Sequence, residues 1–158
     1  MSTKLNLDNL DLQIIQHMMD NAEISYADLG KKLGVSGGTI HVRIKKLEEL
    51  GVSKGNRLAI DHKMLGYDVI AFLGIYLEKS SLYDQVARDL KEIPEIVRLN
   101  YTTGNYSMFC EIMCKDIAQL RNVLHDRLQK IKGIDRTETF ISLDESFDRN
   151  IRVLDDPI

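Results

Sequence analysis

Seven Lys and Arg side chains are concentrated in a short part of the chain, between residues 31 and 57. That part holds only two acidic residues, so its net charge is +5, whereas the whole chain of 158 residues carries −3. A basic cluster of this kind can neutralise the phosphates of nucleic acid. A solvated basic helix face would show the same pattern. The cluster consists of Lys31, Lys32, Arg43, Lys45, Lys46, Lys54 and Arg57.

Residue types that perform catalysis or hold metals are dispersed. The four histidines lack the spacing of a zinc site. Cys110 and Cys114 lie four apart on an expected strand, about 13 Å from each other, so they cannot share a metal or a disulfide there. No phosphate loop, dinucleotide motif or Ser/His/Asp arrangement is present. We therefore expect a binding protein, not an enzyme, with no metal and no cofactor.

Helical patterns in the first fifty residues position the basic cluster. Apolar residues recur at helical spacing over residues 7–19. A second helix begins after Ser25, and Gly34 suits the left-handed residue that ends a helix. Ser36 caps a third helix, which runs to Leu50. A helix, a glycine-containing turn and a capped basic helix are typical of a helix-turn-helix motif, whose second helix enters the major groove of DNA.

The third helix has one apolar and one polar face. The apolar stripe that begins at Ile40 must face the core, so the opposite side and the N-terminal end face DNA. There, Thr39 would meet a base edge, Val42 a thymine methyl, and Arg43 a guanine or a phosphate. The glycines at 37–38 allow a close approach of the backbone, and the lysines would contact phosphates. The predicted DNA-binding residues are Lys31, Lys32, Ser36, Gly37, Gly38, Thr39, Val42, Arg43, Lys45 and Lys46.

The second part of the chain alternates strand and helix patterns. Strands are expected over residues 69–77, 96–101, 106–114 and 137–143, and helices over 82–93 and 117–131. This β-α-β-β-α-β order is typical of a ferredoxin-like unit, with both helices on one face of an antiparallel sheet. The expected fold class is α+β. It combines a helix-turn-helix (winged-helix-like) domain over residues 1–52, a linker with a short strand over 53–66, and a ferredoxin-like domain over 67–150.

Two features of this arrangement concern partners. The strand over 106–114 is apolar on both sides, although helices cover only one face of the expected sheet. A second copy is the simplest cover, and a homodimer also suits the two half-sites of double-stranded DNA. In the linker, Lys54 and Arg57 either reach the DNA backbone or are simply solvated.

The combination resembles the Lrp/AsnC (feast/famine) family of bacterial and archaeal transcription regulators. The helix-turn-helix stretch 26–48 is similar to the signature of that family, and the second unit to its amino-acid-sensing domain. Segments similar to the asparagine-responsive branch are Gly38–Arg43, Leu65–Val69, Tyr101–Gly104 and Thr137–Thr139. The resemblance covers residues 5–150. It implies a regulator that responds to L-asparagine, controls an asparagine synthetase gene and assembles from dimers to octamers.

The resemblance also implies an effector site at the interface between dimers. Its residues come from the glycine-containing hairpin, the second helix and the start of the last strand. They are Leu99, Asn100, Tyr101, Thr102, Thr103, Gly104, Asn105, Val123, Ile134, Asp135, Arg136, Thr137 and Glu138. Backbone N–H groups of the hairpin and Thr hydroxyls suit the effector carboxylate. Asp135, Glu138 or strand-end carbonyls suit its ammonium group, and Asn105 or Thr137 suits a side-chain amide. Without the resemblance, Gly104 and Asn105 would indicate an ordinary hairpin turn.

Two alternatives remain open from the sequence. One is a leucine-type regulator with a different amino-acid effector. The other is an enzyme similar to sirohaem decarboxylases, which use histidines near the haem; only His62 and His125 lie beyond the DNA-binding part, and the basic cluster would then have no purpose. No apolar run approaches the ~20 residues needed to cross a bilayer, and the N-terminus has no apolar signal core. We therefore expect a cytoplasmic protein without membrane contact.

Overall fold

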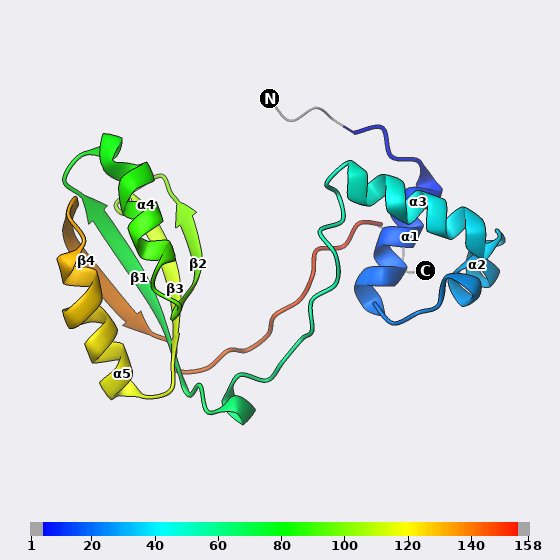
Figure 1. Cartoon of the computed structure of the whole chain (residues 1–158). Helices are drawn as coiled ribbons and strands as arrows, with labels where there is room; N and C mark the ends of the chain where they lie inside the picture. The colour runs from blue at the N-terminus through cyan, green and yellow to red at the C-terminus, as the bar shows by residue number, and fades with distance from the viewer. Residues whose placement is uncertain (1–4, 155–158) are drawn as a thin grey trace. The chain divides into compact units, whose positions relative to one another are not determined.

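The computed structural model describes residues 5–154, which divide into two compact units. Residues 5–59 and 147–154 form the first unit, and residues 60–146 form the second (Figure 1). The chain thus returns to its first unit after the second is complete. There the backbone N–H of Val153 donates a hydrogen bond to Oε1 of Gln16, at 3.0 Å.

These boundaries differ from those expected. The linker expected over 53–66 is divided between the two units, and residues 147–150 belong to the first. The short strand expected in that linker is not formed, because no strand of the described chain pairs with it; Leu58 and Ile60 are 87% and 48% exposed. Residues 1–4, part of the segment in which no signal core was expected, lie outside the described residues.

The first unit is built from helices α1 (Asn9–Asp20), α2 (Tyr26–Leu33) and α3 (Gly37–Glu49). The predicted caps are confirmed: the side chain of Ser25 accepts the N–H of Asp28, and that of Ser36 accepts the N–H of Thr39. Gly34 ends α2 with φ = +70°, a conformation that glycine adopts without strain. The buried core of this unit consists of Ile14, Leu29, Ile40, Ile44 and Leu47.

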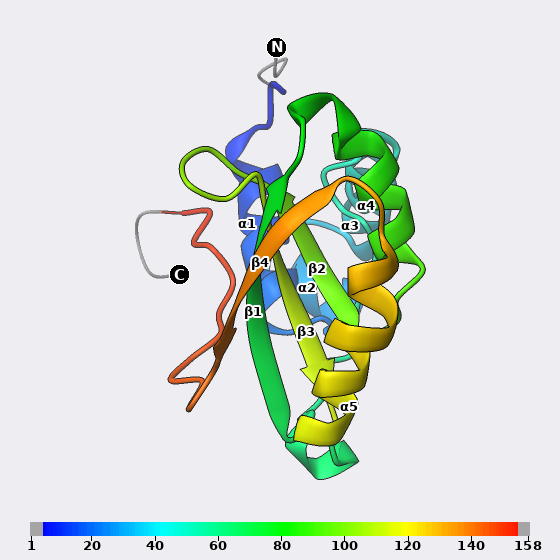
Figure 2. The ribbon, with the colours of Figure 1, turned by 90° about the vertical axis from the view of Figure 1, so that its left-hand side faces the viewer.

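The second unit is a four-stranded antiparallel sheet with helices. Its strands are β1 (Val69–Leu77), β2 (Ile96–Tyr101), β3 (Met108–Cys114) and β4 (Ile134–Ile141), in the order β2-β3-β1-β4. Helices α4 (Tyr83–Lys91) and α5 (Ile117–Asn122) both lie on one face of the sheet (Figures 1 and 2). The predicted ferredoxin-like arrangement is therefore confirmed.

Several element ends differ from the expected ones. β4 begins at Ile134 instead of residue 137, because Ile134 pairs with Leu77 across a register shift. β3 begins at Met108 instead of residue 106. The helix expected over 117–131 continues after α5 as a π-helical turn (Val123–Arg127) and a 3-10 turn (Leu128–Lys130). The wider π turn has an i→i+5 pattern, which keeps Val123 and Leu128 buried on the same side.

The two faces of the sheet have different chemistry. The inner face packs against the helices through buried residues of β1 and β3, among them Leu73, Ile75 and Ile112. The outer face carries aromatic side chains, and Phe72 and Phe109 stack with ring centroids 6.1 Å apart. Within residues 60–146 no helix covers this outer face, as the two-sided apolar strand predicts.

Candidate functional site

The outward face of α3 is the candidate DNA-contacting surface. Ile40, Ile44 and Leu47 are buried, so the opposite side of the helix points away from the core. Val42 lies on that opposite side with 66% of its surface exposed, and Lys45 and Lys46 on either side of it are also exposed. An apolar side chain between two cations matches a groove that offers thymine methyl groups between phosphates.

The N-terminal end of α3 is more constrained than the sequence indicated. The hydroxyl of Ser36 lies 2.9 Å from that of Thr39 and also caps the helix, so these two side chains hold each other. A Cβ on Gly37 would lie 3.2 Å from backbone atoms of Ala27, which means that Gly37 allows α2 and α3 to pack closely. Gly37 therefore has a packing role besides the approach to DNA expected of it, whereas a Cβ on Gly38 would make only an ordinary contact, 3.7 Å from Oγ of Ser36.

Arg43 does not lie on the outward face. Its Nη1 atom is 2.6 Å from a carboxylate oxygen of Asp8 and 2.7 Å from one of Asp11, whose side chain is only 1% exposed. The Arg43 guanidinium holds the pKa of Asp8 below its usual range. These two carboxylates compete with the expected contact of Arg43 with a guanine or phosphate, which stays a prediction. Arg43 flanks the apolar stripe of α3 and connects α3 to the N-terminus of α1.

The remaining basic residues are available at the surface. Lys31 and Lys32 lie in the last turn of α2, and both are exposed. Lys31 lies 3.3 Å from a carboxylate oxygen of Asp28, an exposed pair that stabilises the helix only slightly. Gly30 is a functional position that the sequence reasoning missed: a Cβ there would lie 2.7 Å from the carbonyl oxygen of Val35. Gly30 thus permits the tight turn that leads into α3.

The hairpin between β2 and β3 carries the first group of candidate effector residues. Thr102 Oγ1 donates to the carbonyl of Tyr106 at 2.7 Å and closes the loop. Gly104 has φ = +102° at the tip, and Thr103 and Asn105 beside it are exposed. The loop projects on the side of the sheet away from the helices (Figure 2). Its geometry therefore presents backbone N–H groups at an accessible tip.

At the base of this hairpin, the residues of β2 have different environments. Leu99 is half-buried and packs against the core of the second unit. Asn100 is exposed, and the exposed Tyr101 packs against Tyr83 with ring centroids 4.4 Å apart. The exposed residues at the hairpin tip are therefore more accessible to a small ligand than Leu99 is.

The start of β4 carries the second group. Asp135 and Arg136 are exposed, whereas Ile134 and Thr137 are half-buried. Arg136 lies over the ring of Tyr76, 4.0 Å from its centroid.

Glu138 is already engaged, because its carboxylate accepts hydrogen bonds from the hydroxyls of Tyr76 at 3.0 Å and Tyr106 at 2.9 Å. Hydrogen bonds from Tyr106 and then Tyr76 hold the pKa of Glu138 below its usual range. The sequence reasoning missed both tyrosines. Tyr76 falls on the outward side of its strand pattern, whereas Tyr106 has the parity of the buried Met108 and Cys110, so alternation gives no sign of its outward position.

Among the candidate effector residues, Val123 lies in the core of the second unit. Its side chain is 2% exposed and belongs to the core between the helices and the sheet. Helical spacing from the buried Leu120 places it on the same inward side, so little of its side chain is available to a ligand. The structure brings the hairpin and β4 together through Tyr106 and Glu138, and leaves Val123 out.

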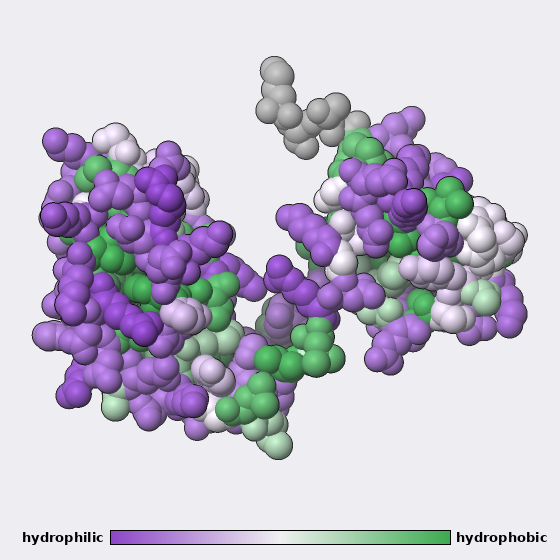
Figure 3. Space-filling view, viewed as in Figure 1, coloured by the Kyte–Doolittle hydropathy of each residue, from purple (hydrophilic) through white to green (hydrophobic). Residues whose placement is uncertain are grey.

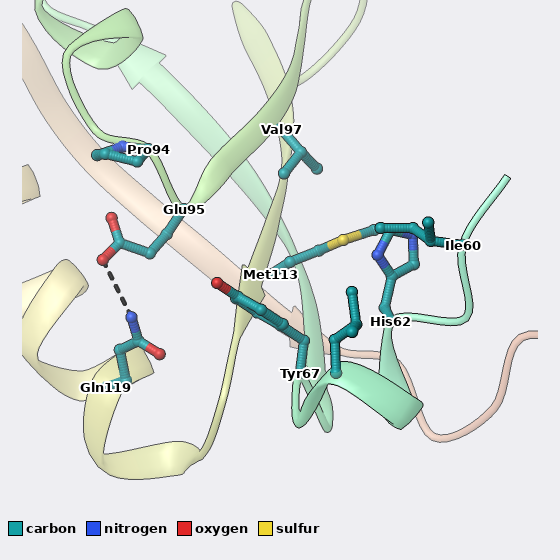
Figure 4. A pocket seen from close by; sticks show the side chains of 9 residues that line it. Ile60, His62, Tyr67, Pro94, Glu95, Val97, Met113 and Gln119 are labelled. Atoms are coloured by element: carbon teal, nitrogen blue, oxygen red, sulfur yellow. Dashed lines mark hydrogen bonds between the residues drawn. The ribbon is translucent and has the colours of Figure 1, made fainter. Parts of the chain in front are cut away.

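A cavity of about 450 Å³ lies elsewhere in the second unit (Figure 4). It contains none of the candidate effector residues, and Glu95 at its edge accepts a hydrogen bond from Gln119 at 3.1 Å. Its lining residues are Ile60, His62, Leu65, Tyr67, Pro94, Glu95, Val97, Met113 and Gln119. The cavity is therefore separate from the hairpin and the start of β4.

Both cysteines lie in the core of the second unit. Burial raises the pKa of Cys110 to about 12 and that of Cys114 to about 11, so both thiols stay protonated in the core. In residues 5–154 no group of three or more His, Cys, Asp or Glu side chains is placed to hold a metal ion. Within the same range, no helix combines the length and the apolar character needed to cross a membrane.

Comparisons with known proteins identify two family domains in the chain. Residues 7–48 match the AsnC-type helix-turn-helix domain, and residues 70–151 match the Lrp/AsnC ligand binding domain. The chain is 42% identical over 147 residues to Regulatory protein AsnC of Haemophilus influenzae, covering 93% of this chain and 98% of that protein. Its identity to the Escherichia coli protein of the same name is 42% over 146 residues, covering 92% and 96%.

The solved structure of Escherichia coli AsnC has the same fold, with a TM-score of 0.88 and 40% identity over 94% of this chain and 99% of that one. These relatives are regulators and not enzymes, which rules out the decarboxylase-like alternative. The protein is a DNA-binding transcription regulator that belongs to the Lrp/AsnC family.

Proposed function

We propose that the protein is a dimeric regulator that binds double-stranded DNA through α3 and responds to L-asparagine. The observation that carries the DNA-binding role is the outward face of α3, with the exposed Val42 between Lys45 and Lys46. The asparagine response is supported by the four segments similar to the asparagine-responsive branch and by the identity to two proteins named AsnC.

On DNA, the outward face of α3 would lie in the major groove. Val42 would contact a thymine methyl, and the hydroxyl of Thr39 a base edge or a phosphate. Lys45 and Lys46, with Lys31 and Lys32 at the end of α2, would neutralise phosphates and make binding dependent on salt. Asp8 and Asp11 already hold the guanidinium group of Arg43, so it is less available to this interface.

The effector would bind between the hairpin and the start of β4. Backbone N–H groups at residues 103–105 suit its carboxylate, since consecutive N–H groups in a turn with a positive φ form an anion-binding concavity. Asp135 is the better acceptor for the ammonium group, because Glu138 already accepts two hydroxyl hydrogen bonds. Asn105 or Thr137 would then donate to and accept from the side-chain amide.

A second copy would cover the outer face of the sheet. That face is aromatic, and no helix covers it within the second unit. Apolar surface is also exposed on the segment that precedes β1 (Figure 3), where Met64 and Leu65 are 82% and 59% exposed. A homodimer would bury both surfaces and place two copies of α3 on two half-sites. Dimers would assemble further, to an octamer.

The gene controlled in this proposal is one for asparagine synthetase, and the location is the cytoplasm, where the DNA partner is found. For the response to occur, asparagine must bind two states of the assembly with different affinities.

A thermal-shift screen of the purified full chain against the twenty amino acids tests the proposal. A ligand at 100 times its Kd stabilises the native state by about 2.7 kcal/mol, which is a large change in Tm. We expect L-asparagine to give the largest shift. A shift with leucine or another amino acid alone would refute the asparagine assignment and support the leucine-type alternative. Loss of binding to duplex DNA on Lys45→Ala with Lys46→Ala, measured by fluorescence anisotropy, tests the DNA surface.

A further inference from the structure

Tyr106, a residue of the hairpin, lies flat on the outer face of β1. A Cβ on Gly74 would come within 2.5 Å of two carbons of the Tyr106 ring, so the ring occupies the space that any other side chain at position 74 would fill. The ring also contacts Tyr76 in an edge-on arrangement, with centroids 5.2 Å apart, and Phe140 with centroids 6.3 Å apart. Because Gly74 has no side chain, the ring of Tyr106 can cross the outer face of β1.

On the far side of β1, the hydroxyl of Tyr106 contacts Glu138 of β4. It donates to one oxygen of the Glu138 carboxylate at 2.9 Å, while the hydroxyl of Tyr76 donates to the other oxygen at 3.0 Å. Gly74 and Glu138 are direct partners in the register between β1 and β4. An ionised carboxylate is a stronger acceptor than a neutral oxygen, and the hydrogen bonds from Tyr106 and then Tyr76 lower the pKa of Glu138 further.

We propose that Tyr106 is the positioning residue of the effector site: its hydroxyl fastens the hairpin to Glu138 and so fixes the separation between the two segments that hold the amino acid. This inference rests on the proposed effector site. The hairpin joins β2 and β3, and β1 lies between β3 and β4 in the sheet. A side chain that crosses β1 is therefore needed to connect the hairpin with β4. A loop held in its binding conformation loses less entropy when a ligand binds.

Two variants separate this role from a general contribution to stability. Tyr106→Phe keeps the ring over Gly74 and removes only the hydroxyl. Tyr76→Phe is the matched control, because it removes a hydrogen bond to the same carboxylate from a strand residue that does not belong to the hairpin. Both lose one charge-assisted hydrogen bond, so any difference between them comes from the freedom of the loop. Gly74→Ala tests the same tyrosine by displacing its ring.

The experiment is titration of the full chain with L-asparagine by calorimetry, together with hydrogen exchange of the amides of residues 103–106 without ligand. We expect Tyr106→Phe and Gly74→Ala to raise the Kd about tenfold and to speed hairpin exchange. Tyr76→Phe should change the Kd less than twofold. An unchanged Kd in Tyr106→Phe, or an equal rise in Tyr76→Phe, would overturn the inference.

A flat titration of the unsubstituted protein would instead overturn the proposed effector site, and with it the role of Tyr106 in ligand binding. The exchange measurement does not depend on any ligand. Unchanged hairpin exchange in Tyr106→Phe would therefore overturn the fastening itself, even if asparagine binds.

Discussion

The ion pairs of Arg43 give the sharpest prediction about the DNA-binding unit. Removing one partner of a buried pair costs about 3–5 kcal/mol, because the other charge is left unpaired. Here Arg43→Ala would leave the Asp11 carboxylate, 1% exposed, without its cation. Arg43 itself is 28% exposed, and Asp11 keeps a hydrogen bond from the N–H of Asp8 at 3.2 Å. We therefore expect a smaller loss, about 2–3 kcal/mol in the free energy of unfolding of this unit.

Hydrogen exchange read by mass spectrometry suits this measurement, because it resolves α1 and α3 from the second unit. A loss of about 2–3 kcal/mol should speed exchange in α1 and α3 by about 30- to 150-fold. Lys45→Ala is the matched control: it is exposed on the same helix, so it should change stability by less than about 0.5 kcal/mol while weakening DNA binding.

A double substitution tests the cause of the loss. Arg43→Met combined with Asp11→Leu replaces the pair with apolar groups and should recover much of the lost protection, because no buried charge then remains. Arg43→Ala with unchanged exchange would refute the reasoning. That result, together with a loss of affinity for a selected duplex and none for random DNA, would instead make Arg43 a base-reading residue.

Three further predictions concern the hairpin tip, the outward face of α3 and the ion pair of Asp8. Gly104→Val should abolish the thermal shift with L-asparagine and spare DNA binding, because φ = +102° is strained for a branched side chain; a variant that still responds to the ligand would contradict the hairpin site. Lys46→Ala should weaken binding to all duplexes about equally and lower the slope of log affinity against log salt by about 1, whereas a sequence-dependent loss would make it a base contact. Because the folded pKa of Asp8 is lowered from 3.8, its contribution to stability is complete above that pH and is lost as the pH falls below it; acid titration by circular dichroism should show this loss in the unsubstituted protein and less of it in Arg43→Ala.

Local signals in the sequence predicted most of the helix-turn-helix unit. Ser25, Gly34 and Ser36 act within three residues of their own position, so their types and spacing suffice to place helix ends. The strand patterns over 69–77 and 96–101 matched the structure at both ends for the same reason. Alternation and β-branching are properties of the segment itself.

Contacts between distant residues were not predictable in the same way. The guanidinium of Arg43 meets Asp8 across 35 positions of sequence, and the hydroxyl of Tyr106 meets Glu138 across 32. Both contacts depend on how whole elements pack. Arg43 on the flank of an amphipathic helix was equally compatible with DNA and with a carboxylate on α1, and only the packing of α1 decides between them.

Val123 shows the difference between a residue taken from a family resemblance and one derived from the pattern of its own segment. Helical spacing over residues 117–131 places Val123 on the inward face, and its side chain is 2% exposed in the structure. Its place among the effector residues came only from the resemblance to the family. That assignment stays a prediction, and the burial of the side chain does not support it.

The return of the chain to its first unit has a consequence for synthesis. Gln16 emerges from the ribosome long before Val153, the residue whose N–H it accepts, and all of residues 60–146 lie between them. Domains generally fold as units while the chain is being made. The helices α1, α2 and α3 are therefore made long before the segment from residue 147 onward that completes their unit. That segment joins the DNA-binding unit only after the whole ligand-binding unit has been synthesised.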